Sequence, residues 1–161
     1  MALATRFRLV AGMGGSPITT GHQHAAYRLK LAHGFLEEAR QDADLSRWRS
    51  AVDGAQLAVE NAGKTALALF GRAGRTHNTA THIRRLIGEG RLDAALSERL
   101  ERLAELAELL GPEVHVQTDY GDEVGGRTPW ELFAEEDARQ ALAIAGEAVT
   151  LADQLVRESS P

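Results

Sequence analysis

The sequence predicts an all-α protein, an antiparallel bundle of four to five helices. Three observations indicate this class. Aromatic residues make up only 5% of the 161 residues, whereas strands are usually rich in aromatic and β-branched residues. Apolar residues recur at spacings of three and four through most of the chain, which is the period of a helix face. No two segments alternate apolar and polar residues as paired strands would, so no sheet is expected.

Two long helices are expected in the first half of the chain. The first covers residues 23–41 and has Tyr27, Leu31 and Phe35 on its apolar face, with Leu36 as a further candidate. The second covers residues 46–70. Its apolar face is rich in alanine, which implies that a neighbouring helix approaches closely. This face consists of Trp48, Val52, Ala55, Val59, Ala62, Ala66 and Phe70.

The second half is expected to hold three more helices and one long loop. A short helix covers residues 79–87, and a longer one over 92–110 carries a seam of leucine and alanine that stops at a glycine–proline pair. The last helix covers residues 134–157. Residues 113–129 contain three glycines and end in a proline, so they are predicted to form a loop. A loop of that length in a compact domain is usually functional or disordered.

Length and composition predict one domain without bound metal or other cofactor. Residues 21–158 are expected to form the helical domain and residues 1–20 a flexible lead-in. The absence of cysteine excludes disulfides and thiolate metal sites and allows the cytoplasm, which is the predicted location. His22 and His24 would point to different faces of a helix, which argues against a zinc site. No apolar run approaches the roughly twenty residues that span a bilayer, so no membrane association is expected.

The sequence contains a basic window, residues 61–88, within an acidic chain. The formal net charge of the chain is −5, which disfavours a protein that coats nucleic acid along its length. The basic window has no acid and carries five cations, Lys64, Arg72, Arg75, Arg84 and Arg85. A local cluster of cations on an acidic body attracts an anionic ligand to one place.

Residues 47–85 resemble the second helix and following turn of HEPN domains, which are small all-α proteins. The shared pattern is an alanine-rich helix, a short linker and the sequence Thr-His-Asn. The matching positions are Ala55, Val59, Glu60, Asn61, Lys64, Thr76, His77 and Asn78. Residues 128–149 resemble the closing helix of the same family and its acidic entry. The likeness extends over most of residues 23–156.

The resemblance implies a bundle of four or five helices, often a homodimer, that commonly acts beside a minimal nucleotidyltransferase in toxin–antitoxin pairs. Active members of the family are metal-independent ribonucleases whose signature is an arginine and a histidine separated by a short spacer. Arg72 and His77 fit this signature and are the candidate catalytic residues. The candidate residues for binding RNA or a nucleotide are Lys64, Arg75, Asn78, Arg84, Arg85 and Tyr120.

The chemistry of RNA cleavage explains why such a pair would be useful. Attack by the 2′-hydroxyl needs a group that moves a proton near neutral pH, and the unperturbed pKa of a histidine side chain is about 6.5. The phosphate gains negative charge as it becomes pentacoordinate, and a guanidinium supplies permanent positive charge there. If the protein is an enzyme, it is therefore expected to be a metal-independent endoribonuclease.

A second hypothesis is a non-catalytic helical module that binds another protein. Ala73 stands where catalytic family members usually have a polar residue, and Gly74 lies between Arg72 and His77. The acidic charge of the rest of the chain favours the same hypothesis. Binding of an oligoribonucleotide that weakens as salt rises would distinguish the first hypothesis from the second.

Overall fold

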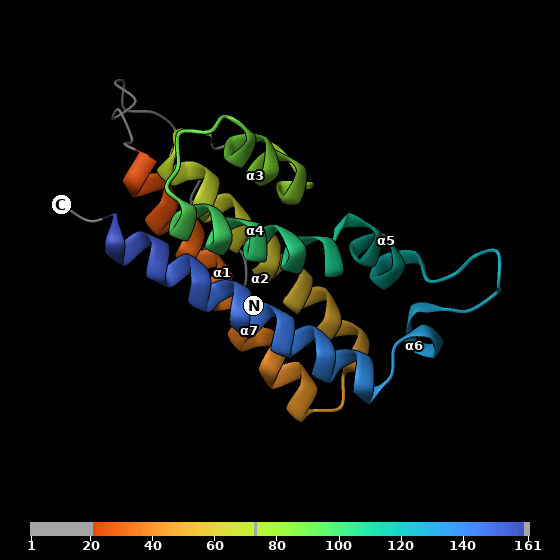
Figure 1. Cartoon of the computed structure of the whole chain (residues 1–161). Helices are drawn as coiled ribbons and strands as arrows, with labels where there is room; N and C mark the ends of the chain where they lie inside the picture. Colours follow the sequence, from red (N-terminus) through yellow and green to blue (C-terminus); the bar gives the residue numbers. More distant parts are fainter. Residues whose placement is uncertain (1–20, 73, 160–161) are drawn as a thin grey trace, which may run out of the picture.

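The computed structural model describes residues 21–72 and 74–159, so the predicted lead-in over residues 1–20 lies outside the described residues. In the described part the chain forms helices and no β-strand, which confirms the predicted all-α class (Figure 1). The helices are α1 (Gly21–Asp44), α2 (Trp48–Leu69), α3 (Thr79–Gly88), α4 (Ala94–Leu109), α5 (Pro112–Tyr120), α6 (Pro129–Leu132) and α7 (Glu135–Glu158).

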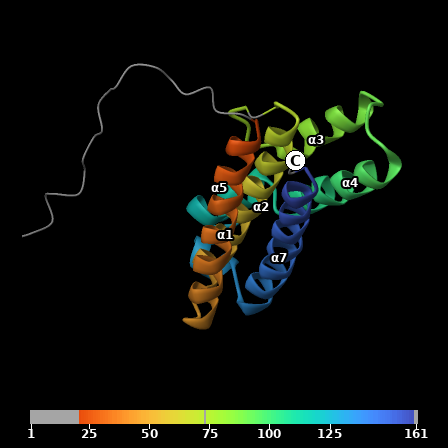
Figure 2. The same cartoon turned by 90° about the vertical axis from the view of Figure 1, so that its left-hand side faces the viewer.

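Helix α2 is the centre of the bundle and contacts every other helix. It lies beside α1 and α7, and α1 runs in the opposite direction to both (Figures 1 and 2). Helices α3 and α4 pack on each other and extend to one side (Figure 2). From Ala51 to Ala68, α2 is buried except at Asp53, Gly54 and Leu57. Helix α2 is therefore buried on nearly all sides and is the main element of the core.

The alanine-rich face of α2 allows the close approach that the sequence predicts. A β-carbon placed on Gly54 would lie 3.0 Å from the β-carbon of Ala39 in α1. The expected apolar face of α1 is wrong at Tyr27, which is 59% exposed, whereas Leu36 is buried and Phe35 packs against the core. At such a short distance between helices there is no room for large side chains. The buried residues of α1 are instead Ala25, Ala32, Leu36 and Ala39.

The prediction of a loop over residues 113–129 is also wrong, because its first half is helix α5. Pro112 stands in the first turn of α5, where proline is well tolerated. The helix is tied to α2: the guanidinium of Arg49 donates to the carbonyl oxygen of Thr118 at 2.8 Å, and the buried Thr118 hydroxyl donates to Asp53 Oδ1 at 2.9 Å. These bonds join residues far apart in the sequence, so local sequence patterns carry no sign of them.

The turn between α1 and α2 holds Ser46 in a left-handed conformation, with φ of 57°. Its N–H donates to the carbonyl oxygen of Ala43 at 2.9 Å, and the N–H of Arg47 donates to the carbonyl oxygen of Asp42 at 2.8 Å. This is the hydrogen-bond pattern of a helix C-terminus at which glycine is usual. We expect Ser46→Gly to raise the free energy of unfolding by about 0.5–1 kcal/mol, because glycine removes the steric cost of this conformation. Urea unfolding measures the change. An equal or lower stability would show that Ser46 is not strained.

In the described part of the chain, every helix is too short or too polar to cross a membrane.

Candidate functional site

Helix α2 ends in a hydrogen-bonded turn. The N–H of Gly71 donates to the carbonyl oxygen of Ala68 at 3.0 Å, and the N–H of Arg72 donates to the carbonyl oxygen of Leu67 at 2.8 Å. Gly71 has φ of 68°, which favours glycine at this place. Beyond the turn, Asn78 begins α3 because its side chain accepts a hydrogen bond from the N–H of Thr81 at 3.2 Å. Asn78, a predicted ligand-binding residue, therefore has a capping role that the sequence analysis did not assign.

Gly63 fixes where α3 begins relative to α2. Thr79, the first residue of α3, is buried against it. A β-carbon at Gly63 would lie 2.5 Å from Thr79 Oγ1 and 2.7 Å from Thr79 Cβ, closer than real side chains pack. Gly63 stands between Glu60 and Lys64 on α2. This contact therefore places His77, two residues before Thr79, over that part of the helix.

Glu60, Lys64 and His77 form a cluster around one carboxylate, which we call the Glu60 cluster. The ammonium of Lys64 donates to Glu60 Oε1 at 2.6 Å. His77 Nδ1 lies 3.2 Å from both oxygens of the same carboxylate. Glu60 is 8% exposed and Lys64 9%, whereas the His77 side chain is 76% exposed. A buried carboxylate, itself paired with a buried ammonium, thus holds an imidazole at the surface.

The charges of the cluster determine its ionisation. Burial raises the pKa of Glu60, but the hydrogen bonds and charges of Lys64 and His77 outweigh burial and hold the pKa of this carboxyl below its usual value. Glu60 is therefore ionised near neutral pH. Its carboxylate accepts from Nδ1–H of His77, which leaves Nε2 on the outer side of the ring. A carboxylate that orients an imidazole in this way is a common arrangement for proton transfer.

The lowered pKa of Glu60 predicts a dependence of stability on pH. A depressed folded pKa contributes stability that is fully present above the unfolded value of about 4.3 and is lost as pH falls through the folded pKa. We expect the wild-type protein to lose more stability between about pH 6 and about pH 3 than Glu60→Gln does, since glutamine has no proton to gain. Urea unfolding at several pH values tests this. Equal losses in the two proteins would contradict a favourably charged Glu60.

A cationic cleft lies beside the Glu60 cluster. Its volume is about 270 Å³, and we call it the Arg75 cleft; it is lined by His24, Tyr27, Arg28, Gly74 and Arg75. The Arg28 guanidinium donates to Asn61 Oδ1 at 3.3 Å, next to Glu60 on α2. The same guanidinium lies 6.0 Å from the centre of the Tyr27 ring. The cleft thus offers two guanidiniums and a solvent-exposed aromatic ring.

The structure does not join Arg72 to His77. Arg72 Nη2 is 2.6 Å from Glu89 Oε1, near the end of α3, whereas His77 contacts Glu60. Among the described residues no hydrogen bond or ion pair connects the two candidate catalytic side chains. Although Arg72 and His77 are only five positions apart in the sequence, their side chains therefore do not contact each other.

Arg84 and Tyr120 also lie apart from the Glu60 cluster. Arg84 links α3 to α4 through Glu101, at 2.8 Å, and through Glu108, and the hydrogen bonds to these two acids raise its pKa above the ordinary value. Tyr120 is exposed at the end of α5, and among the described helices α5 contacts only α2 and α6. Neither residue shares a partner with Lys64 or His77.

Acids outside the basic window neutralise much of its charge. Lys64, Arg72 and Arg84 are all paired with glutamates, of which Glu60 and Glu89 directly flank the window. Within the described ranges, Arg75 and Arg85 are the window cations with no ion pair, and Arg75 lines the cleft. Glu60 is the member of the Glu60 cluster that the sequence reasoning did not select as a site residue. Its spacing of four residues from Lys64 on a buried face was the available signal.

Comparison with known proteins agrees with this architecture. The family model described as HEPN domain matches residues 25–155. The chain belongs to the HEPN domain family. This HEPN domain is also similar to the protein in the crystal structure of TT1696 from Thermus thermophilus. The two share 20% sequence identity with a TM-score of 0.62, over 82% of this chain and 98% of that chain. Comparison with curated proteins gives no match.

Proposed function

We propose that this HEPN domain binds RNA or a nucleotide in the Arg75 cleft. The support is chemical: Arg28 and Arg75 offer guanidiniums to a phosphate, and Tyr27 offers an exposed ring on which a base can stack. The observation that carries the proposal is the position of this cleft beside a histidine whose imidazole Glu60 orients. Lys64 would act indirectly, by keeping that carboxylate charged.

We further propose that the bound RNA is cleaved without a metal ion. Nε2 of His77 takes the proton of a 2′-hydroxyl, and the 2′-oxygen attacks the adjacent phosphorus. The bond from phosphorus to the 5′-oxygen breaks, that oxygen takes a proton from water while the protonated His77 returns its own to the solvent, and a 2′,3′-cyclic phosphate and a 5′-hydroxyl result. Arg75 would balance the growing charge on the phosphate. Arg72 would join it once a phosphate displaces Glu89, whose carboxylate lies 2.6 Å from Arg72 Nη2.

His77→Ala tests the proposed reaction. We expect the wild-type protein to cleave a labelled oligoribonucleotide in excess chelator and His77→Ala to lose at least about a hundredfold in rate, the usual contribution of a general acid or base. His33→Ala is the matched control, because His33 is exposed on α1 and pairs with Asp153. Cleavage retained in His77→Ala would remove His77 from the mechanism. Salt-sensitive binding without cleavage in the wild type would leave the binding function and exclude the nuclease.

A protein-interaction module is the second candidate, and an apolar surface favours it. Val116, Tyr120 and Val124 are all exposed around a hollow at the end of α5. If the wild-type protein ignores the oligoribonucleotide at low salt, this candidate replaces the first.

We also propose that this protein forms a homodimer and acts with a minimal nucleotidyltransferase, because both are common in the family. A dimer would bring two Glu60 clusters to one RNA. Light scattering of the purified protein gives the mass, and a monomer at all concentrations would contradict the dimer.

A further inference from the structure

An apolar groove lies at the end of the bundle where α2 and α7 end and α4 begins. Its volume is about 250 Å³, and we call it the terminal groove; its apolar lining consists of Leu69, Phe70, Leu96 and Leu155. The first three of these side chains are only partly buried. Apolar groups gain free energy by leaving water for such a lining. From Glu60 to Leu69 the helix rises about 14 Å, so the terminal groove is separate from the Glu60 cluster.

The first helix begins close to this groove. Gly21 lies against the end of α2: a β-carbon placed on it would be 2.6 Å from the carbonyl oxygen of Ala68 and 3.9 Å from the nitrogen of Gly71. Leu69 and Phe70, which line the groove, stand between those two residues in the sequence. Figures 1 and 2 both show α1 beginning beside the ends of α2 and α7. The stretch of chain before α1 is therefore attached at the end of the bundle that carries the groove.

That stretch, residues 1–20, contains a short segment whose chemistry fits the groove. It has no acid, and its two arginines, Arg6 and Arg8, alternate with Phe7 and Leu9. In an extended conformation successive side chains point to opposite sides. Phe7 and Leu9 would then share one side and the two arginines the other. An extended segment of this kind can present an apolar face to the groove and positive charge to its rim.

The rim of the terminal groove complements those arginines. Among the described residues that line it, the charged ones are Asp93, Glu158 and Arg99, which together carry a net charge of −1. Asp93 and Glu158 are both exposed, and Arg99 pairs with Glu158. Opposite charges at the edge of an apolar contact fix its register and disfavour other occupants. The lining therefore favours an occupant that is apolar on one side and basic on the other.

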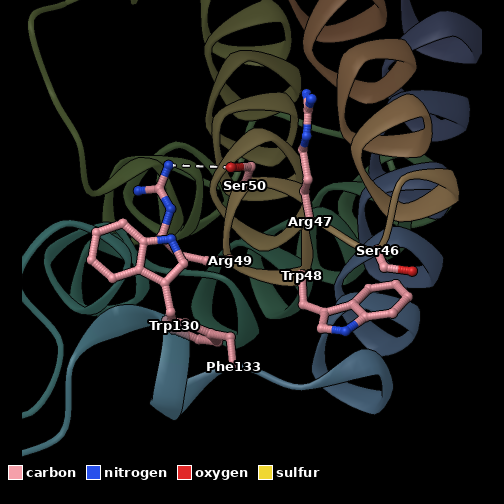
Figure 3. A pocket seen from close by; sticks show the side chains of 7 residues that line it. All are labelled: Ser46, Arg47, Trp48, Arg49, Ser50, Trp130 and Phe133. Atoms are coloured by element: carbon pink, nitrogen blue, oxygen red, sulfur yellow. Dashed lines mark hydrogen bonds between the residues drawn. The ribbon is translucent and has the colours of Figure 1, made fainter.

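The larger pocket at the start of α2 does not suit the same segment. It has a volume of about 390 Å³ and is lined by Trp130, Phe133 and the residues around the α1–α2 turn. Figure 3 shows that Arg47 and Arg49 are among them. These cations would repel the arginines of the segment. The pocket also lies at the opposite end of α2, which is 22 residues and about 33 Å long.

We propose that residues 6–10 dock in the terminal groove of the same chain, with Phe7 and Leu9 in the groove and Arg6 and Arg8 at its acidic rim. The ten residues between this segment and α1 can span up to about 35 Å, so the connection is long enough. A separate partner would lose translational and rotational freedom on binding. A segment attached beside the groove loses much less, because its effective concentration there is high. This difference favours the chain's own segment as the occupant.

A spin label on the full chain tests the docking. The chain contains no cysteine, so Ala4→Cys takes a nitroxide at one defined place. We expect the label to abolish the methyl signals of Leu69 and Leu96 in the groove and to leave those of Leu45, an exposed leucine at the other end of the bundle, unchanged. Leu9→Asp in the labelled chain is expected to restore the groove signals, because a carboxylate does not enter an apolar lining.

Three further variants separate docking from mere proximity. Met13→Asp places the same charge outside the segment and is expected to leave the loss of the groove signals unchanged. Asp93→Asn is expected to reduce this loss, since it removes a charge from the rim while asparagine still caps α4. Asp137→Asn makes the same change at the start of α7, about 36 Å along that helix from its end, and is expected to have no effect.

Three outcomes would overturn the proposal. The first is a label that leaves the groove signals intact in the otherwise unchanged chain. The second is a loss of signals that persists in Leu9→Asp, because it would reflect attachment near the groove and not docking. The third is a loss that arises between molecules when spin-labelled chains are mixed with isotope-labelled ones, because this would place the segment in the groove of a second copy.

Discussion

Glu60→Ala is expected to destabilise the protein by about 3 kcal/mol, because it leaves the buried ammonium of Lys64 without its carboxylate. The same change frees the imidazole of His77 from its only acidic partner among the described residues. Cleavage or binding of RNA should therefore fall even where the protein remains folded. Urea unfolding near neutral pH gives the change in free energy.

The control for Glu60→Ala is Glu135→Ala. Glu135 pairs with Arg139 four residues later, as Glu60 does with Lys64, but both groups of that pair are exposed. Exposed pairs are worth about 0–1 kcal/mol, so this variant should be nearly as stable as the wild type. If Glu60→Ala costs no more than Glu135→Ala, the Glu60 cluster does not hold this part of the bundle together.

Gly63→Ala is expected to cost about 1–3 kcal/mol and to displace His77. The new β-carbon would meet the Thr79 side chain, so the start of α3 has to move away from α2. His77 precedes Thr79 by two residues and would move with it. We therefore expect the functional loss in this variant to approach that of His77→Ala, although Gly63 itself has no chemistry to offer.

Gly34→Ala is the matched control for this substitution. Gly34 also lies inside a long helix, α1, but an added β-carbon there meets nothing within 4 Å. Replacing it should stabilise the protein by about 0.5–1 kcal/mol, the ordinary gain of alanine over glycine in a helix. Similar effects of the two substitutions would show that Gly63 is not a point of close contact.

The bounds of α2, α3 and α4 could be predicted because the signals for them are local. Periodic apolar residues and the glycines near residues 71, 88 and 111 place the predicted ends close to those of α2, α3 and α4. The inward face of α1 could be predicted only in part, because most of its buried residues are alanines outside the predicted face. It depends on how closely α2 approaches, which is set by the meeting of Ala39 with Gly54 and not by either helix alone.

The candidate site could be predicted only in part, for the same physical reason. Lys64 and His77 could be selected from residue type and spacing, and the structure brings both to Glu60. The partners of Arg72 and Arg84 are Glu89 at the end of α3 and Glu101 and Glu108 in α4, and no short sequence pattern indicates these pairs. Trp48 and Trp130 line one pocket although 82 positions separate them in the sequence, which only the folded chain reveals.

The state of the His77 ring tests the central claim most directly, namely that Glu60 orients this imidazole toward the surface. Long-range proton–nitrogen spectra at a pH where the ring is neutral report which nitrogen carries the proton, and His77→Ala assigns the signal. We expect the proton on Nδ1 in the wild-type protein, donated to Glu60, and a shift toward Nε2 in Glu60→Gln. A proton on Nε2 in both proteins would contradict the account.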